Sequence, residues 1–363
     1  MNISVCIIAK NEEKNIRRCL ESLKPYPFEM IVVDTGSWDR TKEIAFQYTR
    51  HVYDFVWCDD FAAAKNFAVS KASHSHIMIL DSDEYIKVLD FEKLLDAAAK
   101  HPDGVGRIQR VNILTRKNEI QEKKEWINRI FAKDKYHYEG RIHEQVEAFS
   151  GGNYETYPVP LIIGHTGYDL PMDLKREKAF RNIHLLKEEL KFLEEAKNEE
   201  KIPYILYQLG KGYYMAEEYA CACEYFARGL SYDLNPKLEY VIDMVETYGY
   251  ALLNSNQKDA ALFFENIYQE FGNTADFQFL MGLIYMNNAR FSEAVQEFQK
   301  AAGQKDAKTT GINSYAAYYN IGVICECLGD KDEAAKYYKM CREYRPAKER
   351  LQGLDMKEGV DRK

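Results

Sequence analysis

The 363-residue sequence has no apolar run that approaches the ~20 residues needed to cross a membrane. Its first residues, 1–8, also lack the basic, apolar and small-residue succession of a secretion signal. The eight cysteines are not spaced like a disulfide framework, so we expect them to be reduced thiols. These absences predict a cytoplasmic protein without an integral membrane segment.

An excess of positive charge is missing as well. The net charge of −8 argues against a nucleic-acid partner, whose binding requires a basic surface. Neither a glycine-rich dinucleotide fingerprint nor a phosphate-binding loop ending in Gly-Lys-Ser/Thr follows the first apolar run, which excludes two common nucleotide-binding modules. What the chain does have is 46% hydrophobic residues and a length that predicts two domains.

The first part of the chain alternates between strand-like and helix-like segments. Continuous apolar runs at 3–8, 30–33 and 77–80 are typical of strands buried on both faces. Helical spacing occurs between them, at 11–23 and 60–71. This alternation predicts a Rossmann-like α/β domain with a mostly parallel sheet.

Polar residues follow each of the three strong strands. Asn11 follows the first, Asp34 the second, and Asp81-Ser82-Asp83 comes directly after the third. Ligands of such sheets bind beyond the carboxyl ends of the strands, and paired carboxylates there suit Mg²⁺ or Mn²⁺ beside a phosphorylated donor. Taken singly, Asp34 could be a helix cap and Asn11 a turn residue. Their convergence on one edge favours a binding site.

Four successive segments, 4–13, 32–41, 59–68 and 80–84, resemble the motifs of family 2 glycosyltransferases in their order along the chain. The resemblance implies a GT-A fold, a nucleotide-sugar donor, commonly a UDP-sugar, and inversion at the anomeric carbon.

The resemblance also implies roles for particular residues. Asp34 would hydrogen-bond the nucleobase, with Ala9 and Asn11 lining the base and ribose pocket. Asp81 would contact the ribose or the metal shell, and Asp83 would ligate the Mn²⁺ or Mg²⁺ that bridges the diphosphate. These five residues would form the donor site.

Basic and acid–base residues complete this assignment. Lys65 stands where the family often has arginine in an Ala-Arg-Asn string, so a charge near the donor is kept without the planar fork of arginine. Glu144 is the first candidate for the base that deprotonates the acceptor, and His143 is the rival, because its unperturbed pKa near ~6.5 suits proton transfer. Arg129 and Arg141 could pair with the diphosphate or form surface ion pairs.

A late histidine is the second metal candidate. His165 matches the place where GT-A enzymes frequently supply a further metal or phosphate ligand, although it could equally be a hydrogen-bonded residue at a strand end. The segments 129–131, 138–145 and 163–168 resemble a subgroup whose transferase domain is followed by tetratricopeptide repeats. Peptide S-glycosyltransferases that modify glycocin bacteriocins are members of that subgroup.

The second half of the chain repeats with a period near the roughly 34 residues of the tetratricopeptide unit. Gly210, Gly282 and Gly322 precede alanine and aromatic residues at matching offsets, and Gly249 begins a more degenerate unit shifted by one position. We expect four helical hairpins in which these glycines let paired helices approach, while large aromatic side chains fill the gaps. Stacked hairpins form a concave surface that suits a peptide or protein.

These patterns predict a GT-A domain at 1–170, a connecting helix at 171–202, an all-α tetratricopeptide-repeat domain at 203–350 and a polar tail at 351–363. The predicted function is metal-dependent, inverting transfer of a hexose or N-acetylhexosamine from a nucleotide sugar to a peptide or protein recruited by the repeats. The alternatives are a glycan or lipid-linked saccharide acceptor, or a noncatalytic scaffold with a vestigial nucleotide site. Formation of a homo-oligomer through the repeats is left open.

Overall fold

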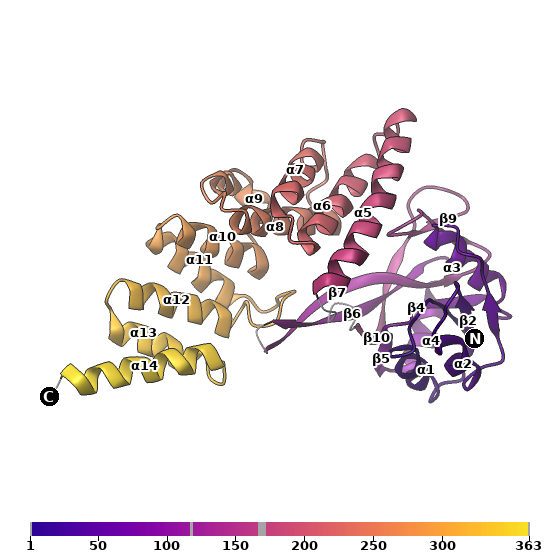
Figure 1. Cartoon of the computed structure of the whole chain (residues 1–363), viewed down its shortest axis with the longest axis horizontal. Helices are drawn as coiled ribbons and strands as arrows, with labels where there is room; N and C mark the ends of the chain where they lie inside the picture. Colours follow the sequence, from indigo (N-terminus) through magenta and orange to yellow (C-terminus); the bar gives the residue numbers. More distant parts are fainter. Residues whose placement is uncertain (1, 117–118, 166–171, 362–363) are drawn as a thin grey trace. The chain divides into compact units, whose positions relative to one another are not determined.

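The computed structural model describes residues 2–116, 119–165 and 172–361. The chain divides into two compact units, Met1–Lys175 and Arg176–Lys363, and each is described by itself (Figure 1). The expected border between residues 170 and 171 lies outside the described residues. No helix within the described ranges combines the length and the apolar character needed to cross a membrane.

The first unit is built on an eight-stranded sheet with the order β3-β2-β1-β4-β7-β6-β10-β5. Strands β1 to β4 run parallel, as do β6 and β10, whereas β7 and β5 join in antiparallel pairs. A separate hairpin sheet pairs β8 with β9. The predicted α/β fold with a mostly parallel sheet is confirmed. The strands are β1 (Ile3–Ala9), β2 (Glu29–Asp34), β3 (Val52–Asp54), β4 (His76–Asp81), β5 (Glu84–Leu89), β6 (Val105–Arg116), β7 (Glu119–Ala132), β8 (Tyr136–Glu139), β9 (Gln145–Ala148) and β10 (Thr156–His165).

Hydrophobic cores cover both faces of this sheet. Helices α1 (Ile16–Leu23), α2 (Thr41–Phe46) and α4 (Phe91–Lys100) supply one core, and α3 (Phe61–Ser70) supplies the other together with β8 and β9. Along β1, Val5 and Ile7 enter the first core and Cys6 enters the second, as the pleat of a strand requires. Because both faces are covered, the central strands are continuous apolar runs.

The first helix begins later than its sequence pattern predicts. The pattern extends over 11–23, but Asn11 adopts a left-handed φ of 56° and α1 begins only at Ile16. The intervening residues form a turn in which the N–H groups of Asn15 and Ile16 both donate to the carbonyl of Glu12. A left-handed residue cannot continue a right-handed helix, so Asn11 stays at the end of β1.

The second unit is helical throughout its regular segments. Its helices are α5 (Met172–Glu195), whose first four residues belong to the first unit, α6 (Ile202–Met215), α7 (Tyr219–Gly229), α8 (Glu239–Asn254), the 3₁₀-helix η1 (Ala260–Ile267), α9 (Tyr268–Phe271), α10 (Ala275–Asn287), α11 (Phe291–Gly303), α12 (Tyr315–Cys327), α13 (Lys331–Met340) and α14 (Arg345–Asp361).

The repeat glycines stand where their hairpins are tightest. A Cβ placed on Gly210, Gly282 or Gly322 would lie 2.5 to 2.6 Å from an aromatic ring of the following helix. The rings belong to Phe226, Phe298 and Tyr338. The expected register of small and large residues is therefore confirmed in three hairpins. The fourth departs from it, because its second helix begins as η1 and a Cβ on Gly249 would meet Leu280 of α10 at 2.6 Å.

Candidate active site

The loops that follow β1 and β2 are tied together at the carboxyl edge of the sheet. The Ala9 carbonyl accepts a hydrogen bond from Thr35 N–H at 2.9 Å. Asn11 donates its backbone N–H to Ser37 Oγ at 2.9 Å, and its Oδ1 accepts from Trp38 N–H at 3.0 Å. These bonds fix the left-handed Asn11 against the turn that carries Asp34.

Asp34 ends β2 and is only 4% exposed. Its Oδ2 accepts hydrogen bonds from the N–H groups of Gly36, at 3.1 Å, and Ser37, at 2.9 Å, so the carboxylate closes the turn. Its Oδ1 is buried without a hydrogen-bond partner. A buried acceptor left unpaired costs about 1–3 kcal/mol, so this oxygen is suited to an N–H group of a ligand.

The end of β4 and the middle of α3 meet in an ion-pair cluster around a buried lysine. Lys65 on α3 is 4% exposed, and its ammonium lies 3.1 Å from Asp81 Oδ1 and in direct contact with Glu144 Oε1. Burial by itself lowers the pKa of Lys65, but the carboxylates of Asp81 and Glu144 outweigh it, so the pKa is raised. Lys65 therefore stays protonated and holds two carboxylates together.

Asp81 is shared between two cations. Its Oδ2 accepts a 2.6 Å hydrogen bond from Arg129 Nη2, on β7. Burial favours the neutral form of Asp81, yet the charges of Arg129 and Lys65 hold the pKa of Asp81 well below its usual range. Glu84, fully buried at the start of β5, accepts the backbone N–H of Asp81 at 2.9 Å and also contacts Arg129 at 3.2 Å. The Asp81 carboxylate is thus ionised and fixed in place.

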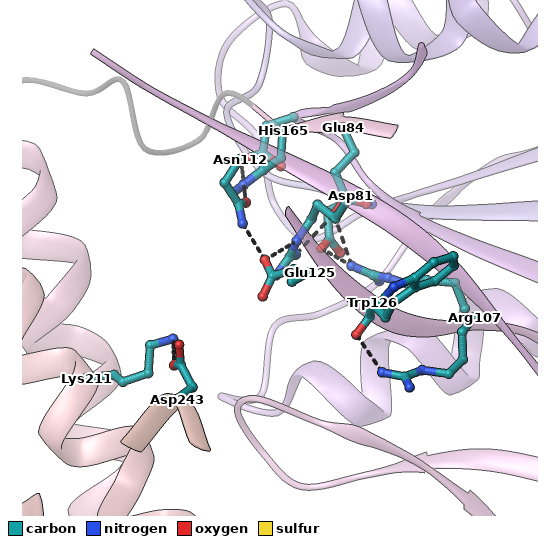
Figure 2. Close-up of polar contacts among 12 residues, drawn as sticks. Asp81, Glu84, Arg107, Asn112, Glu125, Trp126, His165, Lys211 and Asp243 are labelled. Carbon is teal, nitrogen blue, oxygen red and sulfur yellow. Dashed lines mark hydrogen bonds and ion pairs between the residues drawn. The ribbon is translucent and has the colours of Figure 1, made fainter. Parts of the chain in front are cut away.

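Asp83 and His165 lie together at the end of β10. His165 Nε2 is 3.3 Å from Asp83 Oδ2, and His165 Nδ1 is 2.8 Å from Asn112 Oδ1. Asn112 on β6 in turn donates to Glu125 on β7, as Figure 2 shows. The outer partners orient the imidazole, which is how proteins prepare a histidine for metal coordination.

The network continues through Arg110, which contacts Glu84 at 3.2 Å and Glu125 at 2.8 Å. It therefore connects the Asp81 group to the group that contains His165. The sequence reasoning missed the roles of Glu84, Arg110, Asn112 and Glu125. For Glu84 a signal existed, since it directly follows the Asp81-Ser82-Asp83 string.

A carboxylate and an imidazole are ligands that Mn²⁺ accepts, and carboxylate oxygen is the ligand that Mg²⁺ prefers. Among the described residues no group of three or more His, Cys, Asp or Glu side chains could hold a metal ion by itself. Asp83 and His165 supply two possible ligands, and a site with so few protein ligands resembles those of Mg²⁺ at nucleotides, where phosphate oxygens and water complete the coordination.

The loop between β8 and β9 carries the remaining candidates. Gly140 and His143 have positive φ values of 97° and 53°, so the chain turns sharply on both sides of Arg141. The Arg141 carbonyl accepts from Phe61 N–H at 2.8 Å, whereas its side chain is exposed. Glu144 is directed to Lys65 and His143 is half-buried. Residues 166–168 of the last predicted motif lie outside the described residues.

The structure thus forms three groups from the predicted residues. Ala9, Asn11 and Asp34 share the edge formed by β1 and β2. Lys65, Asp81 and Glu144 form the ion-pair cluster. Asp83 and His165 form a pair. Arg129, considered for the diphosphate, is 6% exposed and directed to Asp81 and Glu84.

Comparison with known proteins adds the family. Residues 4–157 match the model of the family described as Glycosyl transferase family 2. A TPR repeat-containing protein of Synechococcus elongatus is 43% identical over 82 residues, which cover 23% of this chain and 20% of that protein. The SPbeta prophage-derived glycosyltransferase SunS of Bacillus subtilis is 23% identical over 290 residues, covering 78% of this chain and 67% of SunS.

The chain spans only a small part of the first of these relatives and about two thirds of the second. Among solved structures, that of MamA aligns with 50% of this chain and 99% of its own at 25% identity, with a TM-score of 0.38. By this match, residues 4–157 of the first unit form a domain of the glycosyltransferase family 2 type.

Proposed function

We propose that the protein is an inverting glycosyltransferase that moves a sugar from a UDP-sugar to a peptide or protein acceptor recruited by its helical repeats. The observation that carries this proposal is the buried, unpaired Oδ1 of Asp34 on the same sheet edge as the Asp81 and Asp83 carboxylates. The family match and the likeness to SunS support glycosyl transfer.

The nucleobase is the natural partner for Asp34. An imide N–H of uracil can donate to the unpaired Oδ1 while Oδ2 keeps the turn of Gly36 and Ser37 closed. Asn11 and Ala9 flank this position through their bonds to the same turn. This arrangement supports recognition of a base that presents a donor to Asp34.

Asp83 and His165 would hold Mn²⁺ or Mg²⁺ beside the diphosphate. The bound metal would neutralise charge on the departing nucleotide diphosphate. Asp81 is positioned by Arg129 and Lys65 toward the same edge, and its lowered pKa keeps it anionic. The role for Asp81 is therefore a permanently charged contact to the ribose or the metal shell.

Inversion requires a base on the acceptor side of the sugar. Glu144 remains the first candidate, because its carboxylate is fixed by the buried ammonium of Lys65 and retains 11% side-chain exposure. The proton of the acceptor would pass to a Glu144 oxygen as the new glycosidic bond forms and the bond to diphosphate breaks. His143, one residue earlier on the same turn, is the alternative base.

The direct test is turnover of a panel of nucleotide sugars by the full chain with Mn²⁺ or Mg²⁺. We expect hydrolysis or transfer with at least one uridine donor. Asp83→Ala should lower metal-dependent turnover at least about 100-fold, because it removes the only carboxylate of the Asp83–His165 pair.

Asp96→Ala, an exposed aspartate of α4, is the matched control and should leave turnover unchanged. Circular dichroism should be the same for both variants. Absence of binding and turnover for every donor would support the noncatalytic scaffold instead. Activity of Asp83→Ala with undiminished metal dependence would refute the metal assignment.

A further inference from the structure

The first helices of three successive hairpins present a row of charged and aromatic side chains. On α6 and α8, Lys211 Nζ lies 2.7 Å from Asp243 Oδ2, which also accepts a 2.7 Å hydrogen bond from Tyr207 (Figure 2 shows the Lys211–Asp243 pair). Glu246 follows on α8 and Asp276 on α10. We call these five residues the first-helix face.

The face repeats along the chain. Asp243 and Asp276 occupy the same position of two successive repeats, six residues before Gly249 and Gly282. Tyr207 and Glu246 likewise share a position, three residues before Gly210 and Gly249. Repetition of this kind gives solenoid proteins an extended surface for a polypeptide.

Part of the first-helix face is already in contact with a segment of this chain. The connection between α11 and α12 runs from residue 304 to 314, whereas residues 272–274 suffice between α9 and α10. Lys308 in the longer connection places its ammonium 3.0 and 2.9 Å from the two carboxylate oxygens of Glu246.

The backbone of the same segment binds the next carboxylate. The N–H of Lys308 donates to Asp276 Oδ2 at 2.8 Å, and the N–H of Thr309 donates to Asp276 Oδ1 at 3.2 Å. One carboxylate thus captures two consecutive peptide N–H groups while its neighbour captures a lysine side chain. Only the contact with Glu246 uses a side chain of the segment, that of Lys308. The two contacts with Asp276 use backbone N–H groups.

Burial makes these contacts specific. Glu246 is 5% exposed and Asp276 is 6% exposed, so either carboxylate without a partner would carry a large desolvation cost. The Lys308 side chain keeps 35% of its exposure and Thr309 is only half-buried. The two carboxylates therefore form the fixed part of the site, and the segment lies between them and the solvent.

We propose that Glu246 and Asp276 form a binding site for an extended, lysine-bearing peptide, and that Lys308 and Thr309 occupy it as an intramolecular stand-in which such a peptide displaces. The inference deepens the proposed function, because the partner it fits is the peptide acceptor. It assigns the acceptor a basic residue in the segment that the repeats hold.

The test measures binding to the full chain at pH 8, above the pKa of about 7 to which burial raises Glu246, with a synthetic peptide that copies residues 304–313 as the probe. A tethered segment competes at an effective concentration in the millimolar range, so the unmodified chain should bind the probe weakly. In the variant Lys308→Ala with Thr309→Pro, the tethered lysine and one N–H donor are gone. Its Kd for the probe should be at least about 10-fold lower.

Matched changes isolate the contacts. Lys305→Ala, at an exposed lysine of the same connection, should bind like the unmodified chain. Adding Glu246→Gln and Asp276→Asn to the Lys308→Ala, Thr309→Pro variant should raise the Kd again by at least about 10-fold, as should replacing the second lysine of the probe by alanine. If the variant that carries Thr309→Pro does not fold, Lys308→Met is measured in its place, and its Kd for the probe should also be lower than that of the unmodified chain.

A folded Lys308→Ala, Thr309→Pro variant with the same Kd as the unmodified chain would overturn the proposal. So would tight binding whose Kd is unchanged by Glu246→Gln and Asp276→Asn. Both outcomes would mean that the segment only links two successive hairpins. Sugar transfer is not part of the measurement. Failure of the peptide site and failure of the glycosyltransferase assignment are therefore separate results.

Discussion

At the scale of single residues, Asp34 shows how one side chain can serve both the fold and a ligand. Its Oδ2 is used by the N–H groups of Gly36 and Ser37, while its Oδ1 is buried and unpaired. The two oxygens can be separated by experiment, because asparagine keeps one carbonyl oxygen for the turn and replaces the other oxygen with a donor group.

We therefore expect Asp34→Asn to keep the fold and to raise the KM for a uridine donor about 10- to 100-fold, since a donor would face the N–H of the base. Steady-state kinetics and titration calorimetry with UDP would measure the change. An unaltered affinity for UDP would remove Asp34 from the nucleotide site. Loss of the folded state would instead show that both oxygens belong to the turn.

The residues at the strand ends were predictable because their strands are continuous apolar runs. Such runs identify β1, β2 and β4, and whatever polar residue ends them must lie at the edge, as Asp34 and Asp81 do. Arg110, Asn112 and Glu125 could not be found in this way. Arg110 and Glu125 meet because β6 and β7 pair in one register, and the contact of Arg110 with Glu84 depends on the order of strands in the sheet, which no local pattern specifies.

Lys65 is the residue for which the structure alters the expectation most. The family position implies a charge near the donor, but Lys65 is 4% exposed and its ammonium is bound by Asp81 and Glu144. In the structure Lys65 is paired with two carboxylates, so an effect of Lys65 on the donor can also act through the positions of Asp81 and Glu144.

Replacing Lys65 with methionine should lower the free energy of unfolding by about 3 kcal/mol, because it leaves the half-buried carboxylates of Asp81 and Glu144 without their shared, buried cation. Lys42→Met is the matched control, since Lys42 pairs with Asp54 on the surface and such pairs contribute about 0–1 kcal/mol. Urea titration of both variants measures the difference. A stable Lys65→Met variant with a raised KM would return Lys65 to the donor site.

At the scale of elements, strand order decides the site. Strand β10 inserts between β6 and β5, which brings His165 opposite Asn112 on one side and Glu84 on the other. The sequence identified His165 as a candidate, but its partner Asn112 depends on a parallel pairing of β10 with β6 that local patterns do not specify. The start of α1 could not be predicted from local patterns either, because the hydrophobic spacing does not reveal the left-handed φ of Asn11.

The repeat glycines allow an element-scale prediction. A Cβ at Gly282 would lie 2.6 Å from the ring of Phe298, which is fully buried and cannot move freely. Gly282→Ala should therefore destabilise the protein by about 1–3 kcal/mol, although alanine is the better helix former.

Gly303, at the end of α11 in the same hairpin, has nothing within 4 Å of a Cβ. Gly303→Ala should accordingly be neutral or stabilise by up to about 1 kcal/mol. Thermal unfolding followed by circular dichroism would compare the two alanines directly. Equal effects at both positions would mean that close helix packing is not what selects glycine at 282.

At the scale of the whole molecule, each unit has its own buried core. The sheet unit encloses two clusters, one on each face, and the last hairpin of the helical unit encloses another. A chain built in this way can unfold in more than one transition. A substitution in one unit can then be assigned to the transition it moves.

The ionisation of Glu246 makes the stability of the helical unit depend on pH. Burial raises the pKa of Glu246 from 4.5 to about 7, against the opposing effect of Lys308. The folded state therefore binds a proton that the unfolded state has released, at pH values between these limits. The contribution of Glu246 to stability is complete below pH 4.5 and is lost as the pH rises through 7.

We expect the helical unit to lose about 2 to 3 kcal/mol between pH 5 and pH 8 through this one group. Glu246→Gln cannot titrate, so the difference between the variant and the unmodified chain isolates the effect from other groups that titrate in the same range. Calorimetry at both pH values would measure it, and the transition of the sheet unit should respond to pH in the same way with and without the substitution. If the pH dependence of the helical transition is the same in both proteins, Glu246 is ionised at neutral pH, and the attraction of Lys308 outweighs the cost of burying the carboxylate.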